Sequence, residues 1–295
     1  MPPVRVVAAN VGLWQRTRRL LRSRELVSFL VRTQVKVRYK NSVLGILWSM
    51  LNPAMMIGIY YLVFAVILPS GVPLFAVYLF SGLVVWNLFS TAIMTGTSAM
   101  VSNAGIVKKV AFSREVLPIS AVGASLVFFF FQFIVVLIVE AAMRHSPAWG
   151  YVWVLIPALA ALLVLSAALS LLLSAVNVYL RDVQHLVEVF IFLWMWLVPI
   201  IYPYEAHVAV FERYHIQIPY LMDPVVPIVL TFQRVLYAIV KYVPKGSAKP
   251  VALLPVHGPL WYCSLDLGAL AGSLVLFFIG LYVFGRIEGD FAEEL

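Results

Sequence analysis

The sequence has little charge, and over one long stretch it has no ionisable side chain at all. Charged residues make up 12% of the 295 residues, about half the fraction found in typical soluble domains. Residues 41–107, a run of 67, contain no Asp, Glu, Lys, Arg or His. A bilayer-spanning helix needs roughly 20 apolar residues. The stretch therefore predicts two membrane spans joined by a short turn, and it excludes an ordinary soluble domain.

Chemistry is scarce as well. The lone Cys263 cannot form an internal disulfide and offers no metal constellation. The chain has no GxxxxGK[ST] phosphate loop, so we expect it not to hydrolyse ATP. The apolar runs have no charged residue in their middles, where ion-coupled carriers usually place one. We therefore predict a non-enzymatic chain with no catalytic or metal site and no cofactor of its own. A transporter that lacks both an ATPase site and coupling charges must take its energy from a partner chain.

What the chain does have is a basic N-terminal region and six apolar runs. Ten Lys and Arg residues precede residue 41, which we interpret as a cytoplasmic anchor attracted to anionic lipid head groups. Nucleic-acid binding is not expected, because no soluble fold is available to present the cations. No cleavable signal is visible in the first 40 residues, so we expect the first span to be retained as a signal anchor.

The apolar runs predict an all-α polytopic membrane protein with six transmembrane helices. The predicted spans are 43–68, 74–95, 116–139, 151–179, 189–204 and 267–285. They divide the chain into a basic N-terminal region (1–42), a six-span membrane domain (43–285) and a cytoplasmic tail (286–295). Lys and Arg split 15 to 6 between the two sides of this arrangement, which by the positive-inside rule places both termini in the cytoplasm.

Two segments outside the spans have recognisable patterns. Residues 205–266 are too long for a plain turn, and their apolar run is short and interrupted by Pro227 and Arg234. We expect external re-entrant or interfacial helices there, followed by a loop at 241–259. Before the first span, apolar residues fall on one helical face of residues 25–40, which predicts an amphipathic helix on the cytoplasmic leaflet.

Several motifs, in order along the chain, resemble the permease subunits of type-2 ABC exporters of polysaccharides. This family carries O-antigen, teichoic acid, capsule or galactan chains. The matching segments are RYKNSVLGILW (38–48) with Asn52-Pro53, NAGIVKKVAFSREVLP (103–118), NVYLRDV (177–183), PIIY (199–202) and DPVVPI (223–228). The family usually has Pro where Ser113 stands and Asn where Asp223 stands.

The resemblance implies a homodimeric channel in the bacterial inner membrane that moves a lipid-linked polysaccharide. Each copy would work with a separate ABC ATPase, two copies in all, which would hold the ATP and Mg²⁺. The first loop would be the coupling helix that contacts this ATPase, with Ile106, Lys108, Lys109, Val110, Phe112, Arg114 and Glu115 as its residues. Residues 25–40 would be the interface helix, with Arg32, Lys36, Arg38, Tyr39 and Lys40 as its residues.

The residues give these roles a physical basis but leave alternatives. Ile106, Val110 and Phe112 are apolar in a loop that should face water, so they fit either a partner protein or the leaflet surface. The loop cations fit either an acidic partner surface or lipid phosphate. The cations of the interface helix fit lipid anchoring first, and if the substrate is a lipid-linked glycan they also fit the pyrophosphate of its lipid carrier.

Aromatic residues, 14% of the chain, suit a conduit for sugars, whose C–H faces stack on rings. Tyr60, Phe64, Phe190 and Trp194 are the candidate channel lining. The alternative is an interfacial aromatic belt. Two other functions stay open at this point: a type-2 ABC exporter of a drug or small lipid, and an ATP-independent lipid-glycan flippase or membrane glycosyltransferase.

Overall fold

The computed structural model describes residues 12–40, 42, 44–67, 71–110, 112–243 and 250–295. The predicted all-α class is confirmed, since the described chain is helical apart from turns, loops and one short hairpin, β1 (Lys241–Tyr242) with β2 (Val251–Ala252). Parts of three predicted segments lie outside the described residues. They are residues 1–11 of the basic region, residue 43 at the start of the first span, and residues 244–249 of the external loop.

Four helical segments of the described chain are long and apolar enough to cross a membrane. They are α4 (Phe75–Ser102), α6 (Val116–Ala142), the continuous run Trp149–Tyr179 that contains α7 (Leu155–Tyr179), and Pro259–Asp290 that contains α12 (Pro259–Ile287). They contain most or all of the second, third, fourth and last predicted spans, but α4 ends seven residues later than predicted and α12 begins eight residues earlier. Residues 259–266, predicted to lie in the external segment, therefore belong to α12. The other two predicted spans correspond to shorter helices, α3 (Trp48–Tyr61) with a π-helical turn (Leu62–Ile67), and α8 (Val183–Leu197). The count of six spans therefore stays a prediction.

The fifth predicted span, 189–204, has the wrong boundaries. α8 begins at Val183 and ends at Leu197. Pro199 causes the early end, because proline has no amide hydrogen to donate and cannot continue a helix. The carbonyl oxygen of Pro199 is instead held by two other elements: it accepts a hydrogen bond from Gln233 Nε2 at 2.8 Å and lies 3.1 Å from the Tyr78 hydroxyl.

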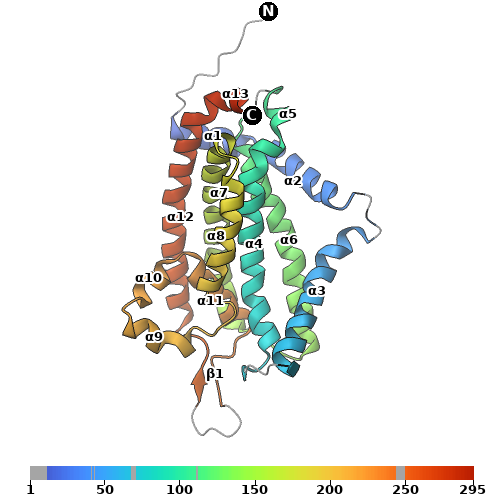
Figure 1. The fold of residues 1–295 in the computed structure, drawn as a ribbon. Helices are drawn as coiled ribbons and strands as arrows, with labels where there is room; N and C mark the ends of the chain where they lie inside the picture. Colours follow the sequence, from blue (N-terminus) through green and yellow to red (C-terminus); the bar gives the residue numbers. More distant parts are fainter. Residues whose placement is uncertain (1–11, 41, 43, 68–70, 111, 244–249) are drawn as a thin grey trace, which may run out of the picture.

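The helices form one bundle with two distinct ends (Figure 1). At one end lie α1 (Leu13–Arg22), α5 (Ala104–Val107) and α13 (Phe291–Glu294), and we call this the α5 end. At the opposite end, called the hairpin end, lie β1 and the short helices α9 (Val208–Arg213) and α10 (Gln217–Met222). α2 (Arg24–Arg38) and α3 occupy one side of the bundle. The basic N-terminal helices and the first loop thus share one end, as the charge count predicts.

A short helix is confirmed in the apolar run after residue 225. It is α11 (Val225–Leu236), and it packs against α4, α7 and α12. Nearly all of its side chains are buried, among them Phe232 and Gln233. α11 is therefore part of the core at the hairpin end rather than a helix lying on the surface.

The centre of the bundle depends on close contact between α4 and α7. In a bilayer, helices associate through packing and interhelical hydrogen bonds, because lipid tails are as apolar as the side chains. Ser170 of α7 donates a hydrogen bond to the Ala92 carbonyl oxygen of α4 at 3.1 Å, and Asn177 donates to the Thr97 carbonyl oxygen at 3.1 Å. Gly96 permits this approach, because a Cβ there would overlap the Ser170 side chain.

Gly96→Ala is therefore expected to destabilise the bundle by about 1–3 kcal/mol, the usual cost of overpacking a core. The measurement is the thermal midpoint of the purified protein in detergent. Gly268→Ala is the matched control, since Gly268 lies in α12 and a Cβ there would meet nothing within 4 Å. Equal midpoints for the two variants would show that the α4–α7 contact is not as tight as described.

Candidate functional site

The loop between α4 and α6 presents two kinds of side chain. Ile106 and Val110 are about half exposed, and Lys108 and Lys109 are exposed. Val107, between them, is buried in a cluster that includes Phe284 and Phe291. The loop is thus anchored through one side chain and leaves an apolar and basic surface, made by residues 106 and 108–110, open to a partner.

The other three residues predicted for this loop turn inward. Phe112 packs against the same cluster as Val107. Arg114 Nη1 donates a hydrogen bond to the Glu288 carbonyl oxygen beyond α12, and the Glu115 carboxylate is buried. These three residues already have contacts within the chain, so they position the loop, whereas the four exposed residues are the ones available for docking.

Arg16 of α1 connects the end of the first loop to the C-terminal end of α12. Its side chain is 6% exposed, and Nη1 donates to Glu115 Oε1 at 2.9 Å. Nη2 donates to Glu288 Oε1 at 2.7 Å and to the Gly285 carbonyl oxygen at 3.0 Å. Gly285 is required here because a Cβ would overlap the guanidinium. We call Arg16, Glu115, Gly285 and Glu288 the Arg16 junction.

Burial dominates the electrostatics of the junction. It raises the pKa of Glu115 above the usual range of a glutamate, and the neighbouring Glu288 acts in the same direction, while Arg16 opposes both. The guanidinium bonds both carboxylates, so removing it would leave the buried Glu115 and the partly buried Glu288 without a compensating charge. An uncompensated buried charge is strongly destabilising.

The predicted interface helix corresponds to α2. Arg32, Lys36, Arg38 and Lys40 are exposed, whereas Tyr39 is half-buried. One face of α2 packs on α6, and the contact is specific. Gln34 Nε2 donates to Ser120 Oγ at 2.9 Å, and a Cβ on Gly123 would lie 2.7 Å from Val31 Cγ2. α2 is therefore a fixed wall against the bundle.

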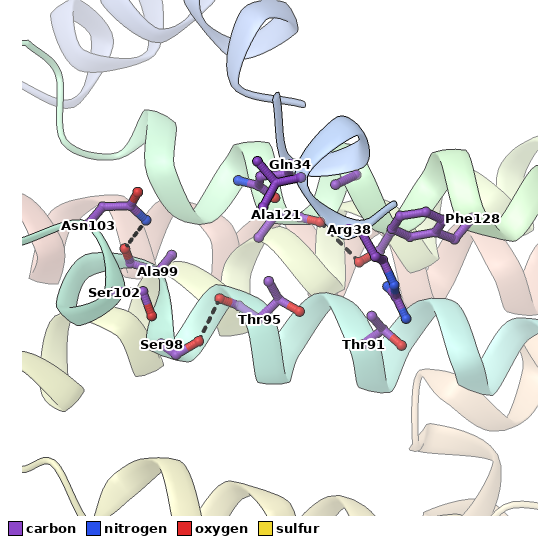
Figure 2. Close-up of a pocket in the computed structure, with 13 residues that line it drawn as sticks. Gln34, Arg38, Thr91, Thr95, Ser98, Ala99, Ser102, Asn103, Ala121 and Phe128 are labelled. Atoms are coloured by element: carbon purple, nitrogen blue, oxygen red, sulfur yellow. Dashed lines mark hydrogen bonds between the residues drawn. The ribbon is translucent and has the colours of Figure 1, made fainter. Parts of the chain in front are cut away.

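A cavity of about 310 Å³ lies between α2, α4 and α6. Figure 2 shows Gln34 and Arg38 on one side of it, Thr91, Thr95, Ser98 and Ser102 along α4, and Phe128 of α6 beside Arg38. The Arg38 guanidinium carbon lies 4.4 Å from the Phe128 ring centroid, and the Tyr39 ring meets the same ring edge-on at 6.0 Å. The cavity thus combines hydroxyl and amide groups with a fixed cation.

The candidate channel aromatics are only partly brought together. Phe190 is 61% exposed on α8, and its ring lies 5.5 Å from that of Trp194. Trp194 itself is anchored, since Nε1 donates to Asp223 Oδ2 at 2.6 Å and its ring meets Phe89 edge-on at 5.2 Å. Burial raises the pKa of Asp223, although its hydrogen bonds act in the opposite direction. Tyr60 packs on the core from α3, and the Phe64 side chain lies outside the described part.

Sequence reasoning missed Arg16 and Glu288 as functional residues. Arg16 is one of many N-terminal cations, and its partners lie 99 and 272 positions away along the chain. No local spacing could have selected it. The amphipathic character of α1 was also missed. The signal that could have found it is a pair of apolar residues at each end of the helix, Leu13-Trp14 and Leu20-Leu21, which lie two turns apart on one face.

The fold defines a multi-pass helical membrane protein whose first loop exposes apolar and basic side chains. The chain belongs to the ABC-2 type transporter family, to which residues 25–220 match. It is 32% identical over 279 residues to the O-antigen export system permease protein RfbA of Myxococcus xanthus, covering 94% of this chain and 98% of that protein. A protein of the same name from Klebsiella pneumoniae is 27% identical over 272 residues, covering 92% and 95% respectively.

Arg16→Met is expected to release α1 and the end of α12, because it leaves the buried Glu115 and the partly buried Glu288 without their cation. Breaking a buried ion pair in this way costs about 3–5 kcal/mol. Hydrogen exchange should rise at residues 13–22 and 286–295. Arg19→Met, an exposed arginine on the same helix, is the control. Adding Glu115→Gln and Glu288→Gln to the Arg16 variant should restore much of the protection. Unchanged exchange in Arg16→Met would rule out the junction as described.

Proposed function

We propose that the chain is the membrane-spanning subunit of an ATP-driven exporter that moves a lipid-linked polysaccharide out of the cytoplasm. The observation that carries the proposal is the end-to-end similarity to O-antigen export permeases, which covers more than nine-tenths of both chains. The α5 end then faces the cytoplasm with both termini, and the hairpin end faces outward. The membrane is the bacterial inner membrane.

The energy comes from two copies of a separate ABC ATPase that bind ATP and Mg²⁺. The docking element on this chain is the exposed part of the first loop. Support comes from its composition, since Ile106 and Val110 give apolar contacts while Lys108 and Lys109 complement an acidic groove. The Arg16 junction holds this loop to α1 and α12, so force applied at the loop reaches both.

A second copy of the chain completes the conduit. α8 supports this, because large apolar side chains along most of its circumference are exposed and only Val187 and Ile191 are buried. The exposed side chain of Phe190 on this helix supports a role in meeting the second copy or a passing glycan. Membrane lipid covers the remaining apolar faces.

Removal of this chain from cells is expected to leave finished polysaccharide on its lipid carrier inside the cytoplasm. Antibody labelling of intact and permeabilised cells measures where the polymer lies, and extraction of the lipid-linked fraction measures how much is made. Normal surface polysaccharide would contradict the proposal. Failure to form any lipid-linked polymer would also contradict it, because that outcome indicates a biosynthetic enzyme.

The double variant Lys108→Glu/Lys109→Glu is expected to lower co-purification with the ATPase by about tenfold or more, since reversed charges at a docking surface cost several kcal/mol. Ile106→Ser/Val110→Ser should have the same direction of effect. Arg213→Glu, an exposed cation at the hairpin end, is the charge-matched control. Phe112→Ala is unsuitable, because that side chain packs within the chain. Full ATPase recovery with both double variants would remove the loop from the docking surface.

A further inference from the structure

The cavity between α2, α4 and α6 has a more polar lining than packing within a membrane bundle requires. It lies beside the half of α4 nearest the α5 end, where lipid or packed apolar side chains would be expected. Thr91, Thr95, Ser98 and Ser102 follow one another at intervals of four, three and four residues, which places them on one face of α4. The row extends roughly 16 Å at 1.5 Å per residue.

The two threonines of this row are available to a ligand. A hydroxyl in a membrane helix normally bonds a carbonyl of its own helix, as Ser98 does with the Met94 and Thr95 carbonyl oxygens at 3.3 and 3.2 Å. The Thr91 and Thr95 hydroxyls have no hydrogen-bond partner among the described residues. Thr95 is exposed and Thr91 half-buried, and both line the cavity.

The Arg38 guanidinium at this cavity is also available to a ligand. Stacking of Arg38 on the Phe128 ring fixes the guanidinium, and Figure 2 shows it reaching from α2 toward Thr91 of α4. No carboxylate within the described residues pairs with Arg38, and no Asp or Glu is among the described residues that line the cavity. An anion would therefore meet a positioned guanidinium with nothing acidic to repel it, and guanidinium binds phosphate with two parallel hydrogen bonds.

We propose that this cavity binds the phosphate-linked polyhydroxyl head group of a membrane lipid. The phosphate lies against Arg38, and the hydroxyl groups of the head lie along Thr91 and Thr95. Ligand sites span roughly 300–1,000 Å³, so a cavity of about 310 Å³ accepts one head group and not a chain of sugars. Two lipids could supply this head group. If it belongs to the lipid carrier of a glycan, the inference rests on the proposed function. The other source is a bulk phospholipid with a glycerol head.

The test is native mass spectrometry of the purified full chain released from detergent, titrated separately with a polyprenyl diphosphate N-acetylglucosamine and with phosphatidylglycerol. Arg38→Gln is expected to weaken binding about tenfold, the scale of a lost charged hydrogen bond. Thr95→Val, which removes a hydroxyl at nearly constant volume, is expected to weaken it severalfold, and Thr95→Ser to restore it. Arg24→Gln is the control, because Arg24 is an exposed cation of α2 that does not line the cavity.

Stronger binding of the sugar diphosphate identifies the carrier as the ligand, and stronger binding of phosphatidylglycerol identifies the bulk lipid. Both support the site. Unchanged binding in Arg38→Gln, unchanged binding in Thr95→Val, or an equal loss in Arg24→Gln overturns it. The assay measures binding to the purified chain and contains neither the ATPase nor a transport step. Its result can therefore be interpreted even if the proposed export function is wrong. Thermal midpoints of all variants, expected to match the parent, separate lost binding from lost folding.

Discussion

A single guanidinium, that of Arg16, holds together three segments that are far apart in the sequence. It bonds Glu115 at the start of α6, Glu288 after α12 and the carbonyl oxygen of Gly285, from a position with 6% exposure. A charge so poorly hydrated must keep its partners, because breaking one side of a buried ion pair costs far more than the pair contributes. Arg16 therefore fixes α1, the start of α6 and the end of α12 relative to one another at the α5 end.

α6 connects this junction to the cavity. Its first residues follow Glu115, while Ser120, Gly123 and Phe128 further along the same helix hold α2 in place. The exposed surface of the loop, the Arg16 junction and the wall of the cavity are thus parts of one continuous, packed structure. Such continuity gives a physical route between a docking site and a ligand site, and double-mutant cycles across it would measure the coupling. In the proposals above, this end of the bundle meets a protein partner through residues 106 and 108–110 and a lipid head group through Arg38.

The sequence was sufficient for the four long helices, because soluble domains rarely contain apolar runs of bilayer length. The side of the membrane that each end of the bundle faces stays a prediction from the distribution of Lys and Arg. The sequence also located the loop and the interface helix, which local periodicity and motif spacing define. It misplaced the bounds of α8 even though the cause is local, because Pro199 ends this helix at Leu197. It failed altogether where the deciding contact was distant. Arg16 gave no signal above the other basic residues, and nothing local distinguished inward-turned Phe112 from exposed Val110.

The central claim is that the α5 end faces the cytoplasm and the hairpin end faces outward. Its most direct test places a single cysteine at Lys109 or at Lys241, both exposed, in a Cys263→Ala background, and applies a membrane-impermeant maleimide to intact spheroplasts. The account predicts labelling at position 241 from outside and labelling at position 109 only after permeabilisation. Labelling of both positions from the same side would contradict it.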